Sequence, residues 1–190
     1  MFNDCELKSI DEGQVRKTIN LVTHDSYNFT GTFEDNLKMG KSDATEEEMY
    51  EVLKKVNLYD FVVGLEKGLE SEIKEAGANL SGGQKQRLAL ARSLLYDSEI
   101  YIFDEATSNI DVESENDIMK IIYELAKEKT VLLISHRLYN VRYADNIYVL
   151  SQGKVNECGN HMELMDRKEM YFELVKEQNQ LEKLGSESCA

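Results

Sequence analysis

The segment NLSGGQKQRLALARSLL, residues 79–95, contains the strongest local signal in this sequence. Leu88, Ala91 and Leu95 recur at helical spacing, which predicts a helix that begins at or just after Ser81. A serine and two glycines at a helix start leave backbone amides unpaired and let another backbone approach closely, as a phosphate site requires. The alternative is an ordinary serine cap followed by glycine spacers. Taken alone, the segment fits that alternative better, because serine so often caps helices.

Short apolar runs lie on both sides of this segment. Residues 19–23, 99–103 and 130–135 are of strand length and rich in β-branched or aromatic side chains. Two of them show little polar alternation, which predicts a parallel sheet covered on both faces. Helical patterns separate the runs, including residues 46–56 behind a capping sequence at 43–48. The expected fold class is therefore α/β.

The C-terminal part has a different pattern. Residues 147–150 and 154–158 are predicted to form two strands around a turn, where Gly153 allows a permissive backbone. One charged amphipathic helix is predicted to follow, over about 162–184.

Composition excludes several classes of function. The 36 acidic and 22 basic residues give a net charge of −14, which disfavours nucleic acid and anionic membrane surfaces as direct partners. No stretch approaches the roughly 20 apolar residues that span a bilayer, and the N-terminus lacks the pattern of a secretion signal. The three scattered cysteines suggest neither a disulfide framework nor a zinc site. We therefore expect a soluble chain that is not secreted.

Two adjacent carboxylates, Asp104 and Glu105, follow the apolar run at 99–103. In α/β sheets, ligands bind at the carboxyl ends of strands. Adjacent strand residues point to opposite sides, so one acid could hold Mg²⁺ while the other orients a water. The alternative is a helix N-terminus, where acidic side chains are favourable.

A histidine, His136, follows the third apolar run. A neutral imidazole at this position could exchange a hydrogen bond with a γ-phosphate or a water. The alternative, which a lone histidine fits better, is a structural hydrogen bond.

The order and spacing of these three segments resemble those of the nucleotide-binding domains of ABC transporters, most closely the exporter kind. Residues 80–84 resemble the signature sequence, 100–105 the Walker B strand and 108–111 the D-loop, while His136 resembles the switch histidine. The resemblance covers nearly the whole chain and includes the segments 29–37, 75–77 and 144–150.

This resemblance implies a P-loop NTPase-like (RecA-like) core with a parallel sheet and an inserted α-helical subdomain. Residues 1–32 and 97–160 would form the core lobe. Residues of about 33–96 would form the helical subdomain with the signature, and 161–190 a C-terminal helical tail.

The resemblance also implies partners and a cofactor. Two cassettes of the family pair head to tail around Mg-ATP, next to the transmembrane domain of a transporter at the cytoplasmic face of the cell membrane. The residues that would bind the nucleotide held by the partner cassette are Ser81, Gly82, Gly83 and Gln84.

The remaining roles that the resemblance implies concern hydrolysis. Asp104 would hold Mg²⁺ through water, Glu105 would polarise the attacking water, and His136 would stabilise the transferring phosphate. Asp111 would link the two nucleotide sites across the interface.

The chain departs from the family pattern at the phosphate-binding P-loop, G-x-x-x-x-G-K followed by Ser or Thr. Residues 40–42 are Gly-Lys-Ser, but Asp35 occupies the position of the first glycine and no strand precedes it, so we interpret this match as fortuitous. Residues 1–10 resemble the part of the family that lies past the P-loop. The N-terminal part of the fold is therefore expected to be missing, and the chain alone is expected to bind ATP poorly.

A second departure is His24, which occupies the position of the family's Q-loop glutamine. Histidine can still form hydrogen bonds, but it is shorter and titrates near neutral pH.

Three hypotheses for function follow. The chain is part of a transport ATPase, which the retained Glu105 and His136 favour. Alternatively it is a non-catalytic module that only donates its signature face to an intact cassette, which the missing loop favours. A weaker alternative, a DNA-repair or SMC-like ATPase, conflicts with the acidic charge and with the absence of a coiled-coil heptad pattern.

Overall fold

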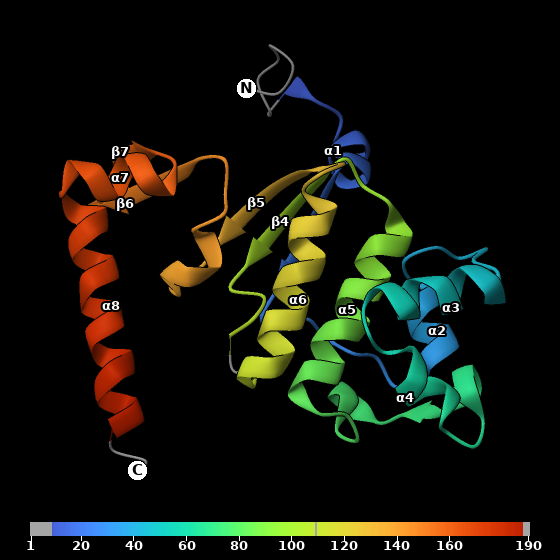
Figure 1. Cartoon of the computed structure of the whole chain (residues 1–190). Helices are drawn as coiled ribbons and strands as arrows, with labels where there is room; N and C mark the ends of the chain where they lie inside the picture. Colours follow the sequence, from blue (N-terminus) through green and yellow to red (C-terminus); the bar gives the residue numbers. More distant parts are fainter. Residues whose placement is uncertain (1–8, 109, 188–190) are drawn as a thin grey trace. The chain divides into compact units, whose positions relative to one another are not determined.

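The computed structural model describes residues 9–108 and 110–187, with side chains through residue 181 (Figure 1). The chain divides into two compact units, Met1–Ile134 and Ser135–Ala190, and each is described by itself.

A three-stranded parallel sheet lies at the centre of the first unit. Its order is β1 (Ile19–Thr23), β4 (Ile100–Asp104) and β5 (Thr130–Ile134). The strands pair so that Thr23, Asp104 and Ile134 lie opposite one another, and their carboxyl ends form one edge. The predicted α/β class and parallel sheet are confirmed, with β4 displaced by one residue from the expected range.

Two helices, α5 (Gly82–Tyr96) and α6 (Val112–Leu125), lie alongside this sheet in Figure 1. Side chains of both helices share one hydrophobic cluster with strand residues such as Val22, Tyr101 and Phe103, which are at most 3% exposed. We call this side of the sheet the packed face.

The opposite side of the same sheet is open. Leu21, Leu132 and Ile134 are 59%, 49% and 46% exposed. Since Leu21, Ile102 and Leu132 lie side by side in the register, and side chains alternate along a strand, these residues share one surface. We call it the open face. Over the described residues, the expected cover lies on the packed face only, because periodicity shows that a strand is apolar but not what lies against it.

Short elements build the rest of the first unit around α5. Their bounds are α1 (Glu12–Thr18), β2 (Gly31–Thr32), α2 (Phe33–Lys38), α3 (Glu46–Lys55), α4 (Tyr59–Val63), β3 (Glu72–Ile73), and the 3₁₀ helices η2 (Gly68–Glu70) and η3 (Glu75–Gly77). The predicted start of α3 is confirmed by a capping box, in which Thr45 and Glu48 each accept a hydrogen bond from the other's backbone N–H.

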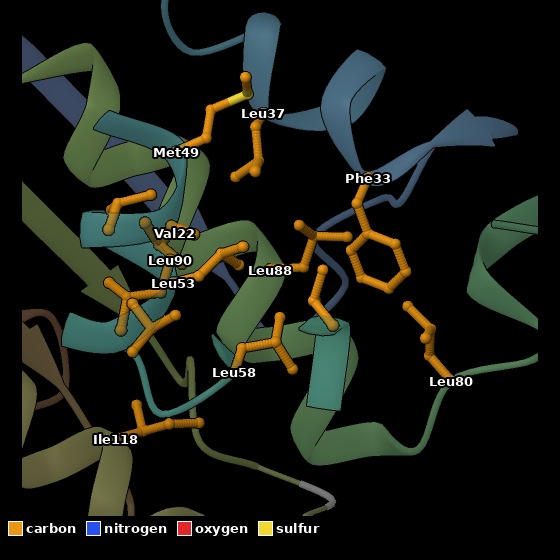
Figure 2. Close-up of a cluster of buried hydrophobic side chains, with 14 of the residues drawn as sticks. Val22, Phe33, Leu37, Met49, Leu53, Leu58, Leu80, Leu88, Leu90 and Ile118 are labelled. Atoms are coloured by element: carbon orange, nitrogen blue, oxygen red, sulfur yellow. The ribbon is translucent and has the colours of Figure 1, made fainter. Parts of the chain in front are cut away.

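The core of this region is continuous with the packed face. Figure 2 shows Leu37, Met49 and Leu53 gathered near Leu88 and Leu90 of α5. All five side chains are at most 2% exposed, so the helical insertion and the sheet share one core in this unit.

The Gly-Lys-Ser match at residues 40–42 has a packing explanation. A Cβ on Gly40 would lie 2.3 Å from the backbone oxygen of Arg92, so only glycine allows this approach to α5. Lys41 forms an ion pair with Glu48. These contacts support the interpretation that the match is not a phosphate loop.

The second unit consists of η4 (Leu138–Val141), an antiparallel hairpin of β6 (Ile147–Ser151) and β7 (Lys154–Gly159), and helices α7 (His161–Arg167) and α8 (Met170–Glu187). The predicted hairpin is confirmed, and Gly153 in its turn has a φ of +74°. Ile147, Val149, Leu164 and Tyr171 form its core.

The single helix predicted over 162–184 is wrong, because the chain forms two helices there. Lys168 adopts a left-handed backbone with φ +55°, which ends α7. The apolar spacing continues on both sides of this break, so periodicity alone did not reveal it. No helix among residues 9–108 and 110–187 is both long and apolar enough to cross a bilayer.

Candidate functional site

Ser81 begins the signature segment as the N-cap of α5. Its Oγ accepts a hydrogen bond from the Gln84 backbone N–H at 3.2 Å, and the Gln84 Oε1 accepts one from the Ser81 N–H at 2.9 Å. The predicted helix start is confirmed, and so is the capping role. The Ser81 hydroxyl can still donate a hydrogen bond while it caps the helix, because a serine Oγ that accepts one hydrogen bond keeps its own proton. Ser81 and Gly82 are exposed, so this donor faces solvent.

Gly83 brings the start of α5 against the start of α6. A Cβ on Gly83 would lie 2.4 Å from the Oγ of Ser114 and 3.8 Å from the Oδ2 of Asp111. A larger residue would require the Ser114 side chain to shift. The two helix N-termini, each with unpaired amides and a partial positive charge, therefore lie next to each other.

Asp111 caps α6. Its Oδ1 accepts a hydrogen bond from the Ser114 backbone N–H at 2.8 Å. This backbone hydrogen bond, followed by one from the Ser114 hydroxyl, lowers the pKa of the Asp111 carboxyl, so the group stays ionised. Asp111 is exposed, while Asn109 of the same predicted D-loop lies outside the described residues.

The carboxylates Asp104 and Glu105 lie at the carboxyl edge of the sheet. Asp104 is the last residue of β4, between Thr23 and Ile134 of the neighbouring strands. Glu105 has already left the strand: its backbone is left-handed, with φ +49°, and its N–H donates to the Ile134 carbonyl at 3.0 Å. A turn, and not strand alternation, therefore directs the Glu105 side chain.

The alternative interpretation of these acids, as decoration of a helix start, is wrong. The next helix, α6, begins only at Val112. The Ser108 N–H instead closes a turn by donating to the Glu105 carbonyl at 2.9 Å. A left-handed glutamate is costly to hold, and such backbone strain clusters at functional sites.

Glu115 of α6 stabilises this turn, a role that was not predicted from the sequence. Its side chain is fully buried in α6, and its Oε1 accepts a hydrogen bond from the Thr107 hydroxyl at 3.1 Å. The sequence does contain a signal for this role. Glu115 lies three residues before Ile118 and four before Met119, so all three share the buried face of the helix, where a carboxylate needs a hydrogen-bond partner.

The site suits magnesium only in combination with phosphate. No cluster of three or more His, Cys, Asp or Glu side chains within the described ranges could form a metal cage. Mg²⁺ commonly binds one or two carboxylates together with water and substrate phosphates, and Asp104 at the strand end fits that chemistry.

His24 is the first residue after β1, at the same edge as Asp104. Its Nε2 lies 2.9 Å from Oδ2 of Asp25, and both side chains are largely exposed. Immediately before it, the Thr23 carbonyl accepts hydrogen bonds from Gln86 Nε2 at 3.1 Å and from the Ser26 hydroxyl at 2.7 Å.

Gln86 was not singled out from the sequence. It is 5% exposed and lies five residues after Ser81, so it connects the signature helix directly to the end of β1. A glutamine on the apolar side of a helix was the signal, since a buried amide needs partners.

Further polar contacts extend this connection along α5. The Ser93 hydroxyl donates to Asn20 Oδ1 at 2.9 Å, and Arg92 donates to the Tyr27 carbonyl at 2.6 Å. Burial lowers the pKa of the Arg92 guanidinium. Asn28 donates to the Lys85 carbonyl at 3.3 Å.

His136 belongs to the second unit and is exposed. It lies in a tight turn in which Ser135 Oγ accepts from the Arg137 N–H at 3.0 Å. Its role toward phosphate stays a prediction.

Comparison with known proteins matches residues 1–108 to the ABC transporter family model. An uncharacterized ABC transporter ATP-binding protein of Haemophilus influenzae is 49% identical over 184 residues, which are 97% of this chain and 33% of that protein. A Staphylococcus aureus protein described as a candidate multidrug export ATP-binding/permease protein is 41% identical over 179 residues, 94% of this chain and 31% of that protein.

Among solved structures, a bacterial Atm1-family ABC exporter with ATP bound matches with a TM-score of 0.84 and 34% sequence identity. The match covers 90% of this chain and 30% of the exporter. The chain thus spans about a third of the length of the relatives it matches. The family model, the identity to these relatives and the fold agree, and the chain belongs to the ABC transporter family.

Proposed function

We propose that this chain is an ATP-binding part of an ABC-type membrane transporter, and that it acts by pairing head to tail with a second cassette around Mg-ATP. The observation that carries this proposal is the close approach of two helix N-termini at Gly83, with the exposed hydroxyl of Ser81 beside them. An exposed, electropositive helix end of this kind is suited to the γ-phosphate of a nucleotide held mainly by another protein surface.

On this proposal, the residues of the signature segment act on the partner's nucleotide. Ser81 donates its hydroxyl proton to a phosphate oxygen while Gln84 keeps the hydroxyl in place through the capping box. Gly82 and Gly83 offer backbone N–H groups without a side chain in the way. Asp111 extends from the neighbouring helix start toward the second cassette.

The carboxyl edge of the sheet serves this chain's own nucleotide. Asp104 would hold Mg²⁺, and the bound ion would supply positive charge toward the phosphates. Glu105 accepts a hydrogen bond from the attacking water and so orients it, from a backbone position set by Ile134 and Ser108.

The names of two relatives support a proposal about partners. Both names refer to ATP binding, and the name of the Staphylococcus aureus relative also refers to a permease. We propose a second cassette and the transmembrane domain of a transporter as these partners, and the cytoplasmic face of the cell membrane as the location of the chain. With a net charge of −14, it is not expected to bind nucleic acid.

A second candidate function is supported by one sequence fact. Residues 1–190 contain no G-x-x-x-x-G-K followed by Ser or Thr, so the amides and lysine of a phosphate loop have no match in these residues. On this alternative, the chain donates its signature face to an intact cassette and hydrolyses nothing at its own carboxyl edge.

Two variants separate these functions when the chain is mixed with an intact cassette of the Haemophilus influenzae relative. Glu105→Gln should lower hydrolysis at this chain's own site by about 10²-fold or more, because it removes the acceptor for the attacking water. Ser81→Asn keeps a good helix cap but removes the hydroxyl, so it should lower hydrolysis at the partner's site.

The readout is phosphate release at matched ATP concentrations, with the exposed Glu128→Gln as control. A loss with Ser81→Asn but none with Glu105→Gln supports the non-catalytic alternative. No effect of either variant would contradict both functions.

A further inference from the structure

The turn that follows β4 holds Glu105 in a costly backbone conformation. The φ of Glu105 is +49°, in the left-handed region that residues other than glycine rarely adopt. If the strand continued, Glu105 would lie on the opposite side of it from Asp104, because side chains alternate along a strand. The direction of the Glu105 carboxylate therefore depends on the contacts that keep this turn in place.

Backbone and side-chain hydrogen bonds both hold the turn. The Glu105 N–H donates to the Ile134 carbonyl, and the Ser108 N–H donates to the Glu105 carbonyl. In addition, the Thr107 hydroxyl donates to Oε1 of Glu115 at 3.1 Å. Thr107 is 6% exposed and Glu115 is 0% exposed, so water competes little for this bond. The bond fastens the turn to α6 only two residues after Glu105.

Packing does not explain why position 115 carries a carboxylate. Glu115 lies on the buried side of α6 with Ile118, Met119 and Ile122. A buried carboxylate is costly, and apolar residues in place of buried charged groups often give equal or greater stability. The first turn of a helix lowers this cost, because the N-terminal end favours negative charge. What the carboxylate adds is a hydrogen-bond acceptor, which the Thr107 hydroxyl uses.

We propose that Glu115 is a positioning residue for Glu105. Through Thr107 it holds the turn in which Glu105 is left-handed, and so it sets the direction from which the Glu105 carboxylate meets the attacking water. The effect on the turn depends on the hydrogen bond alone. The effect on hydrolysis rests on the proposed function.

Nuclear magnetic resonance of the purified 190-residue chain tests the turn. At positive φ an amide proton lies closer to the Hα of its own residue than at negative φ, so Glu105 should show a strong nuclear Overhauser effect between these two protons. Asn57 and Asp97 are internal controls, because both have φ +53° in the same unit but belong to other turns.

Thr107→Val keeps the branched shape of the side chain but removes the hydroxyl, so the signal at Glu105 should fall by about half or more as the residue reaches negative φ. Glu115→Leu should cause the same loss, and the double variant no further loss, because both changes remove one shared contact. Glu115→Gln should restore the signal, since an amide oxygen still accepts from Thr107. If Glu115→Leu does not fold, Thr107→Val and Glu115→Gln still decide the question.

Thr18→Val is the matched control for the loss of a threonine hydroxyl. The Thr18 hydroxyl donates to the Gln14 carbonyl at 2.8 Å within α1, so this variant should leave the Glu105 signal unchanged. An unchanged Glu105 signal in Thr107→Val would overturn the proposal. Equal losses at Glu105, Asn57 and Asp97 would also overturn it, because they would show a general loosening of the unit.

Phosphate release in the mixture with the intact Haemophilus influenzae cassette tests the effect on hydrolysis. Thr107→Val should lower kcat at this chain's own site by about tenfold or more and leave KM for ATP within about twofold, because it misplaces a reacting group without removing a nucleotide contact. Glu115→Gln should rescue kcat relative to Glu115→Leu.

Glu105→Gln in the same mixture separates this proposal from the proposed function. If Glu105→Gln lowers turnover but Thr107→Val does not, the positioning role is wrong. If Glu105→Gln has no effect, the proposed hydrolysis at this site fails, while a selective loss of the Glu105 signal in Thr107→Val still supports the role of Glu115 in the turn.

Discussion

The packed and open faces of the central sheet are formed by the same three strands but have opposite environments. On the packed face, Val22, Tyr101 and Phe103 are almost fully buried against α5 and α6. On the open face, Leu21, Leu132 and Ile134 remain about half exposed. Both sets are apolar, so hydrophobicity alone does not stabilise a fold. A residue contributes only when another element removes it from water.

The largest effect is expected for truncation on the packed face. Phe103→Ala should lower the free energy of unfolding by about 3–5 kcal/mol, because a buried aromatic is lost and a cavity remains. Leu132→Ala on the open face should cost less than about 0.5 kcal/mol. Urea denaturation of both variants measures the difference. If Phe103→Ala does not fold, the milder Phe103→Leu should still cost more than Leu132→Ala, and equal losses would remove the distinction between the faces.

An intermediate effect is expected where the helices of the packed face meet. Gly83→Ala should cost about 1–3 kcal/mol, because its Cβ would overlap the Ser114 side chain. The double variant Gly83→Ala/Ser114→Gly removes the obstructing atoms and should recover most of the loss. A double-mutant cycle by thermal or urea unfolding checks this, and simple additivity of the two single changes would argue against the close approach.

The smallest effect is expected from pH at the exposed start of α6. Hydrogen bonds from Ser114 lower the folded-state pKa of Asp111 below its unfolded value. The resulting stabilisation is therefore fully present above the unfolded pKa, about 3.9, and is lost as the pH falls through the lowered folded pKa. Asp111→Asn keeps a capping side chain without the titration, so its unfolding free energy should fall less steeply below about pH 4 than that of the unchanged chain. Parallel plots of unfolding free energy against pH for the two proteins would show that ionisation of the Asp111 carboxyl contributes nothing to stability.

Local features of this fold were predictable from the sequence. The start of α5 at Ser81 and that of α3 after Thr45 follow from capping boxes, which depend on residues three positions apart. The range of β1 was predicted without error, because a short β-branched run bounded by polar residues has few alternatives.

Features set by distant contacts were not predictable in the same way. The open face depends on which elements lie over the sheet, which strand periodicity does not encode. The break at Lys168 and the turn at Glu105 both require positive φ at residues that rarely adopt it, so residue type gave no warning. The expected domain limits, and the individual roles of Ser81, Asp104, Glu105 and His136, stay predictions.

The hydrogen bond from Gln86 of α5 to the Thr23 carbonyl of β1 restricts bending between these two elements. Together with the pairs Ser93–Asn20 and Arg92–Tyr27, it fastens α5 to β1 and to the segment that follows. Any rotation of the signature helix against β1 must break several of these bonds at once. Amide hydrogens of α5 and β1 should therefore exchange with solvent in one cooperative opening. A conformational change that moves Ser81 must also move the end of β1.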